Sequence, residues 1–107
     1  MNIQYKKGVL ELCVLSSLVQ HDMYGYELST YISKEMEISD GTVYPILRKL
    51  RAEGYVTTFL SEDSGGPPRK YYSITDLGKD KFQSESKEWL YFTSKISKFI
   101  KGVADYE

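Results

Sequence analysis

Hydroxyl, aromatic and basic side chains are grouped between residues 42 and 49, at a spacing that suits hydrogen bonding to DNA. Thr42 can donate a hydrogen bond to a phosphate or a base edge, and Tyr44 can contact a thymine methyl group or a phosphate. Arg48 can bind the edge of a guanine through two parallel hydrogen bonds, whereas Lys49 is suited to a phosphate. The chemistry that these residue types support is recognition of nucleic acid.

A helix is expected to carry these side chains. Ser39 or Asp40 could cap the free amide groups at its start, and Ser39 is also expected to contact DNA. Gly54 is expected to end the helix as its C-terminal cap. One face of the helix shows the i, i+3, i+4, i+7 spacing of a buried stripe, formed by Val43, Ile46, Leu47 and Leu50.

Two residues of this helix have a structural alternative. Tyr44 could pack beneath a following β-hairpin instead of contacting DNA, with Pro45 only setting the first turn of the helix. The side chain of Lys49 could equally face solvent. The exposure of the two side chains separates these alternatives.

A β-hairpin is expected to follow this helix, which begins after Ser39 or Asp40, ends at Gly54 and is called the reading helix below. Residues 55–60 are aromatic and β-branched, as in a strand, and residues 61–68 have the composition of an exposed loop. Residues 69–75 resume a strand that begins with Arg69 and Lys70. From that position the two cations could reach a flanking groove or the DNA backbone.

Two helices are expected before the reading helix. Residues 7–20 are apolar on more than one side, so they would pack on both the DNA-binding core and a second subunit, or be fully buried in one chain. After a turn at residues 21–23, a helix beginning at Tyr24 directs Leu28, Tyr31 and Ile32 inward. A polar turn at residues 35–40 completes a helix-turn-helix. The fold class is therefore mainly α with a small β-hairpin (α+β), a winged helix-turn-helix.

The last part of the chain is expected to form one long helix. Thr75 and Asp76 begin it, and it runs to about residue 103. Apolar residues recur in it at alternating three- and four-residue steps, as in a coiled coil, except where Glu85 interrupts the stripe. A single helix leaving a small domain has no core to cover this stripe, so we expect a homodimer. The predicted dimer contacts are Phe82, Trp89, Phe92, Ile96, Phe99 and Val103.

Length and composition limit the function classes. The 107 residues suffice for one integrated domain, with residues 1–75 as the DNA-binding part and residues 76–107 as the dimerisation helix. The net charge of -1 counts weakly against nucleic-acid binding. Because Cys13 and His21 are the only residues of their types, we expect no metal, no cofactor and no catalytic residues. The absence of a long apolar run and of a signal peptide predicts a cytoplasmic protein without a membrane partner.

Four segments resemble the PadR family of bacterial transcriptional regulators, in the family's order and spacing and over nearly the whole chain. They are GVLEL at residues 8–12, YGYEL at 24–28, GTVYPIL at 41–47 and RKYYSIT at 69–75. The single C-terminal helix is similar to that of the family's small subgroup. The resemblance implies a winged helix-turn-helix homodimer that binds double-stranded DNA at a promoter operator and represses transcription.

The resemblance also implies release from DNA by a small hydrophobic or aromatic effector. In multidrug-sensing members of the family, a tryptophan of the last helix lines an apolar pore at the dimer interface, and Trp89 lies at the matching distance after Thr75. Phe92, Ile96 and Val9 could complete the walls of a site for a planar aromatic effector. Simple dimer packing by Trp89 is the alternative.

A second function class stays open from the sequence. It is a winged-helix protein-interaction module without specific DNA binding, which the modest net charge would suit. The basic residues of the reading helix favour the DNA-binding hypothesis. Saturable, sequence-selective DNA binding would distinguish the two.

Overall fold

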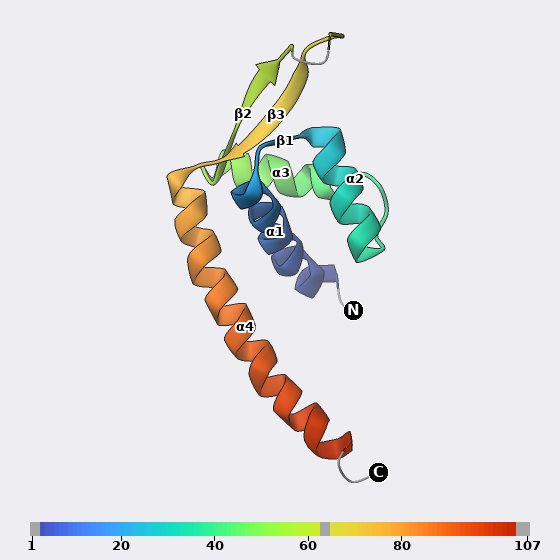
Figure 1. The fold of residues 1–107 in the computed structure, drawn as a ribbon, viewed down its shortest axis with the longest axis vertical. Coiled ribbons are helices and arrows are strands. Elements are labelled where there is room, and N and C mark those ends of the chain that lie inside the picture. The colour runs from blue at the N-terminus through green and yellow to red at the C-terminus, as the bar shows by residue number, and fades with distance from the viewer. Residues whose placement is uncertain (1–2, 63–64, 105–107) are drawn as a thin grey trace.

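The computed structural model describes residues 3–62 and 65–104, so residues 63 and 64 of the predicted loop lie outside the described residues, as do 1, 2 and 105–107. Four helices and three strands are present in this part of the chain (Figure 1). In chain order they are α1 (Ile3–Gln20), β1 (Met23–Tyr24), α2 (Gly25–Met36), α3 (Val43–Ala52), β2 (Val56–Ser61), β3 (Arg69–Ile74) and α4 (Asp76–Ala104). The predicted α+β fold class, with its hairpin and long last helix, is confirmed.

The sheet has one strand more than the predicted hairpin. Its order is β1-β3-β2, and both pairings are antiparallel. Met23 pairs with Tyr72, and Tyr24 pairs with Tyr71, so the predictions of a turn at Met23 and of a helix beginning at Tyr24 were wrong. A strand of two residues is too short to show an alternating pattern, and it forms here because β3 offers it a free edge.

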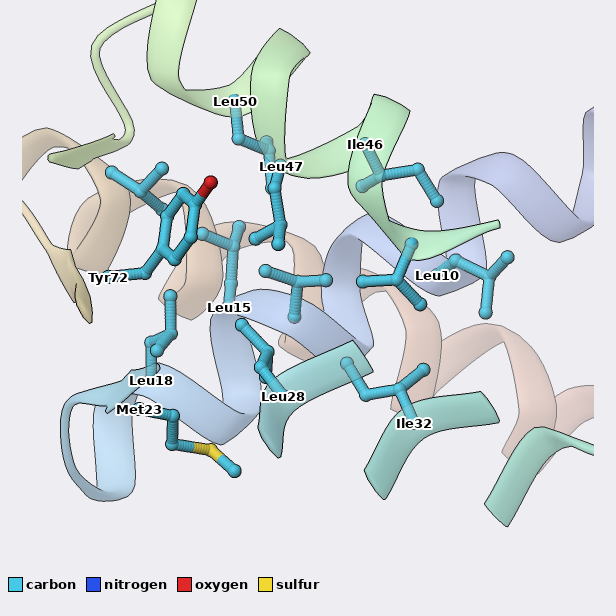
Figure 2. Close-up of a cluster of buried hydrophobic side chains, with 13 residues drawn as sticks. Leu10, Leu15, Leu18, Met23, Leu28, Ile32, Ile46, Leu47, Leu50 and Tyr72 are labelled. Carbon is cyan, nitrogen blue, oxygen red and sulfur yellow. The ribbon is translucent and has the colours of Figure 1, made fainter. Parts of the chain in front are cut away.

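The hydrophobic core lies between α1, α2 and α3, and is closed at one end by the sheet (Figure 2). Leu15 of α1, Leu28 of α2 and Leu47 of α3 are completely buried, and their side chains point toward one another. Met23 and Tyr72 lie at the sheet end of this cluster. The predicted buried face of α3 is confirmed, because Val43, Ile46, Leu47 and Leu50 are all buried.

The buried face of α2 is rotated from the predicted one. Leu28 and Ile32 are buried as expected, but Tyr31 is 50% exposed, so the prediction that it points inward was wrong. Ser29 and Ser33 take the buried positions instead. Small side chains on that side allow α2 to approach its neighbours closely, and this turns the larger Tyr31 toward the surface.

The two ends of α3 differ in how well the sequence predicted them. At the start, Thr42 is the N-cap and no side chain caps the helix, so the predicted capping by Ser39 or Asp40 was wrong. The carbonyl of Ser39 instead accepts a hydrogen bond from the amide of Thr42 in a turn, at 3.3 Å. At the end, Gly54 has φ of 84°, and the Tyr55 amide donates to the Leu50 carbonyl at 2.9 Å. Gly54 therefore ends α3 as predicted, because it takes the left-handed conformation at lowest cost.

The start of α4 is joined closely to the end of α3. The Thr75 hydroxyl oxygen accepts a hydrogen bond from the amide of Gly78 at 3.0 Å, which confirms the predicted cap, and donates one to the carbonyl of Gly54 at 2.7 Å. A Cβ atom at Gly78 would lie 2.1 Å from the carbonyl oxygen of Tyr55, so only glycine allows this approach. From this joint α4 runs beside α1 and then extends beyond the other elements (Figure 1).

Candidate nucleic-acid interface

A hollow of about 500 Å³ lies where the start of α2, the exposed side of α3 and the start of β3 meet. It brings together four of the seven residues predicted to contact DNA: Tyr44, Arg48, Arg69 and Lys70. Three of these are cationic, and among residues 3–62 and 65–104 no acidic residue lines the hollow. The remaining lining residues are Tyr24, Gly25, Tyr26 and Tyr72.

Tyr44 is placed where either alternative left open by the sequence can be realised, packing or contact with DNA. It is half-buried and packs against the hydrophobic core, and it also lines the hollow. A Cβ atom at Gly25 would lie 3.3 Å from the Tyr72 ring and 3.7 Å from the Tyr44 ring. Glycine at this position therefore lets both rings lie close to the first turn of α2, where free amide groups favour an anion.

The two cations of β3 are each held over an aromatic ring. The guanidinium carbon of Arg69 lies 4.5 Å from the centre of the Tyr24 ring, and Nζ of Lys70 lies 5.6 Å from the centre of the Tyr72 ring. Attraction of a cation to the electron-rich ring face restrains a long side chain without neutralising its charge. The hollow therefore presents positive charge in an ordered arrangement.

Lys49 is separated from the other predicted contacts. Its Nζ lies 2.6 Å from Oε1 of Glu11 in α1 and 3.8 Å from Oε1 of Glu53. The hydrogen bond and charge of Glu11 raise the pKa of Lys49 above its ordinary value. Lys49 and Arg48 are neighbours in the sequence, but Lys49 is not among the residues that line the hollow. Ser39 and Thr42 are exposed ahead of α3 and also lie outside that lining.

The sequence prediction missed the residues that surround the predicted cations. Tyr24, Gly25 and Tyr26 were assigned only to the start of a helix, although the grouping of two aromatic residues around a glycine was a signal. In the structure Tyr24 ends a strand, so its ring faces Arg69, and Gly25 begins α2. Only the pairing of β1 with β3, which is not visible in the sequence, brings this segment to the cations.

A second hollow, of about 480 Å³, lies between α1 and α4. It brings together three of the four residues predicted to bind an effector, Val9, Trp89 and Phe92, while Ile96 is not among the lining residues. The rings of Trp89 and Phe92 are 6.3 Å apart and inclined at 49°. The remaining lining residues are Gly8, Glu11, Leu12, Glu85 and Glu88.

Two of the three carboxylates in this second hollow already have a cationic partner. Glu11 is paired with Lys49, and Glu85 accepts a hydrogen bond from Nζ of Lys81 at 2.6 Å. The hydrogen bond from Lys81 to Glu85 raises the pKa of that lysine. Glu11 therefore lies between the second hollow and α3, with its carboxylate bound to a side chain of the reading helix.

Metal binding, membrane insertion and thiol chemistry find little support in the described part of the chain. Residues 3–62 and 65–104 contain no cluster of three or more His, Cys, Asp or Glu side chains that could hold a metal ion. No helix within those residues is long and apolar enough to cross a membrane. Burial raises the pKa of the Cys13 thiol, which lowers the fraction of the reactive thiolate.

Several solved structures with the same architecture are those of transcriptional regulators. The transcriptional regulator PadR-like family matches residues 14–84. A PadR-like transcriptional regulator from Bacillus cereus strain ATCC 14579 is 36% identical, with a TM-score of 0.82, and the match covers 91% of this chain and 96% of that one. A transcriptional regulator from Streptococcus is 32% identical, with a TM-score of 0.82 and coverage of 90% and 96%.

A curated relative extends the comparison to a named regulator. The negative transcriptional regulator PadR of Bacillus subtilis (strain 168) is 28% identical, and the match covers 87% of this chain and 51% of the relative. The family and these neighbours are transcriptional regulators and not enzymes, which confirms the expectation that the chain has no catalytic function. The winged fold, the family match and the similarity to solved regulators agree, and the chain belongs to the PadR-like family of transcriptional regulators.

Proposed function

We propose that the protein is a dimeric repressor that binds a promoter operator through the hollow between α2, α3 and β3, and that a small aromatic molecule releases it. The observation that carries the proposal is the meeting of Arg48, Arg69 and Lys70 around Tyr44, with no acid among the lining residues that the structure describes. Such a site suits a DNA backbone, because phosphates account for much of the affinity of DNA-binding proteins. A regulator of this kind acts at the chromosome, in the cytoplasm.

The local charge explains how a chain with a net charge of -1 can bind DNA. The hollow carries three cations, while the acids Glu11, Glu85 and Glu88 line the other hollow, between α1 and α4. Because charges beyond about 10 Å are screened at moderate salt, the local charge matters more than the sum. We assign the α2, α3 and β3 side to DNA and the α1 and α4 side to regulation.

Dimerisation is supported by the exposed apolar side chains of α4. Phe92, Ile96, Phe99 and Val103 are all at least 42% exposed, and Phe82 at the start of the stripe packs against its own core. Ile100 is also exposed and widens this surface, whereas the exposed Leu90 and Tyr91 lie on other sides of the helix. Large contiguous apolar surfaces on small proteins mark contact sites, and a second copy of the same helix would cover this one in the manner of a coiled coil.

Effector binding is supported by the composition of the second hollow. Trp89 and Phe92 offer aromatic surfaces beside the aliphatic Val9 and Leu12, as a planar apolar molecule would require. Repression in particular is supported by the Bacillus subtilis relative, which is named a negative transcriptional regulator. Packing of Trp89 against a second copy of α4 is the competing role for this residue.

The proposal is tested by fluorescence anisotropy of the purified protein with a duplex from immediately upstream of its own gene. A scrambled duplex of the same length and composition is the control, and both are measured at two salt concentrations. We expect the upstream duplex to be preferred at both. Equal binding to both duplexes that weakens steeply with salt would show only phosphate attraction. No binding to either would favour a protein-interaction module instead.

A further inference from the structure

Four aromatic rings form a continuous row, in which three rings lie on the sheet face that points away from the core and the fourth, Tyr26, comes from the start of α2. The ring centres of Tyr26 and Tyr24 are 6.5 Å apart, those of Tyr24 and Tyr71 5.9 Å, and those of Tyr71 and Phe59 5.5 Å. Tyr24, Tyr71 and Phe59 share this face because Tyr71 pairs directly with each of the other two. The opposite face carries Met23 and Tyr72, which are buried in the core.

Arg69 lies over this row at Tyr24. It precedes Tyr71 by two residues on β3 and therefore shares its face, diagonally across from Tyr24. The guanidinium carbon is 4.5 Å from the centre of the Tyr24 ring. Within residues 3–62 and 65–104 no carboxylate forms an ion pair with Arg69, so its charge is not neutralised there.

We infer that Tyr24 is a positioning residue for DNA binding, which holds the guanidinium of Arg69 in the hollow before DNA arrives. The inference rests on the proposed function and adds a residue to it. An exposed arginine loses much conformational freedom when it is fixed against a phosphate or a base, and this loss weakens binding. A ring that restrains the side chain in the free protein reduces that loss.

The Tyr24 ring is itself held in place. Its backbone pairs with Tyr71 in the sheet, and its ring lies between the rings of Tyr71 and Tyr26. The contact with the ring also leaves the N–H groups of Arg69 unclaimed by any carboxylate of the described residues, so they stay available as donors. An acidic residue at position 24 would hold the same guanidinium but would cancel the charge that DNA requires.

The inference is tested with Tyr24→Leu, Tyr24→Phe, Arg69→Ala and the double variant Tyr24→Leu with Arg69→Ala, each in the full chain. Tyr31→Leu is the control, since Tyr31 is a half-exposed tyrosine of α2 that does not line the hollow. Operator affinity is measured by anisotropy, and thermal unfolding followed by circular dichroism reports whether each variant is folded.

We expect Tyr24→Leu to weaken operator binding about two- to fivefold, the range of an exposed cation–π contact. Tyr24→Phe should bind the operator nearly as tightly as the wild type, because it keeps the ring face. Tyr31→Leu should leave operator affinity unchanged. In the Arg69→Ala background, Tyr24→Leu should cause no further loss. An equal loss in both backgrounds, or none in either, would overturn the inference.

Proton NMR of the free protein gives a readout that does not depend on DNA. The Hδ protons of Arg69 should be shifted upfield by the ring in the wild type and in Tyr24→Phe, and should return to ordinary values in Tyr24→Leu. Unshifted Hδ protons in the wild type would overturn the inference. If the wild type fails to prefer its operator while the shift is present, the proposed function fails and the contact between Tyr24 and Arg69 stands.

Discussion

Lys49 of α3 and Glu11 of α1 form an ion pair in which Nζ and Oε1 are 2.6 Å apart. The Glu11 side chain is only 12% exposed, so water solvates its carboxylate less than that of a surface acid. The positive charge of Lys49 compensates for this lost solvation. The neighbouring Arg48 lines the hollow assigned to DNA. Adjacent cations of the reading helix thus have different partners, one within the protein and one proposed outside it.

This difference predicts unequal effects on DNA binding. Lys49→Ala should change operator affinity much less than Arg48→Ala, because the ammonium group of Lys49 is already bound to Glu11. The two variants are compared in the same anisotropy assay at the same salt concentration. A loss for Lys49→Ala as large as that for Arg48→Ala would show that Lys49 leaves Glu11 to contact DNA.

Arg48→Ala should weaken operator binding by about 1–3 kcal/mol if the side chain contacts a base edge. Arg51→Ala is the matched control, since it removes the same charge from the same helix at an exposed position outside the hollow. The measurement is the ratio of dissociation constants for operator and scrambled duplex. Similar ratios for the two variants would mean that Arg48 acts only through general attraction of phosphate.

Replacing Gly78 with alanine should destabilise the fold. The added Cβ atom would lie 2.1 Å from the Tyr55 carbonyl oxygen and 2.7 Å from Cγ1 of Ile74, so the backbone would have to move. Overpacking of this kind costs about 1–3 kcal/mol in the free energy of unfolding. Urea denaturation measures the change.

Gly102→Ala is the control for that experiment. Gly102 is also in α4, and a Cβ atom there would meet nothing within 4 Å. Alanine should stabilise this position by up to about 1 kcal/mol, because glycine is a poor helix former. Destabilisation by both variants would indicate that α4 packs against a second chain near residue 102.

The pH dependence of Cys13 alkylation should differ between the folded and unfolded chain. Burial raises the pKa of this thiol above its ordinary value of 9.0, so at pH 8 the folded protein should react with iodoacetamide more slowly than the chain in urea. Above pH 9 the unfolded chain loses the thiol proton more readily than the folded chain does. The free energy of unfolding should therefore fall as the pH rises. Cys13→Ala should remove that part of the decrease. Equal alkylation rates would show that the thiol is as accessible and acidic as in the unfolded chain.

Planar aromatic dyes should quench the fluorescence of Trp89 saturably if the hollow between α1 and α4 binds an effector. The chain has one tryptophan, so the signal is specific to this site. Trp89→Ala should weaken dye binding, measured by calorimetry, much more than it weakens dimerisation, measured by analytical ultracentrifugation. Equal losses in the two measurements would assign Trp89 to dimer packing.

The elements that the sequence predicted well are those with a local physical signal. The buried stripe of α3 follows from the spacing of Val43, Ile46, Leu47 and Leu50, and Gly54 and Thr75 end and begin helices through backbone geometry and a hydroxyl group. Periodicity and capping act within a few residues, so the sequence alone reveals them.

The features that were missed depend on contacts between distant segments. The strand formed by Met23 and Tyr24 exists only because β3 lies beside it, and the ion pair of Lys49 depends on α1 reaching α3. Arg48, Arg69 and Lys70 could be named from the sequence as cations, but Tyr24 and Gly25 join them only in the folded chain. The rotation of Tyr31 to the surface likewise follows from how α2 packs on its neighbours.

The contacts of Thr75 and Gly78 at the joint between α3 and α4 control where the far end of the long last helix lies. The hydroxyl of Thr75 is hydrogen-bonded to the Gly54 carbonyl just after α3 and to the Gly78 amide in α4, and Gly78 leaves no space at the Tyr55 carbonyl, so these contacts set the angle between the two helices. The 29 residues of α4 span about 44 Å, and a rotation of about 5° at the joint moves the far end by roughly 4 Å. In a pair of chains that associate through α4, the angle between α3 and α4 would set the separation of the two reading helices. In the proposed dimer, a small molecule bound between α1 and α4 would therefore change the distance between the two reading helices without contacting α3.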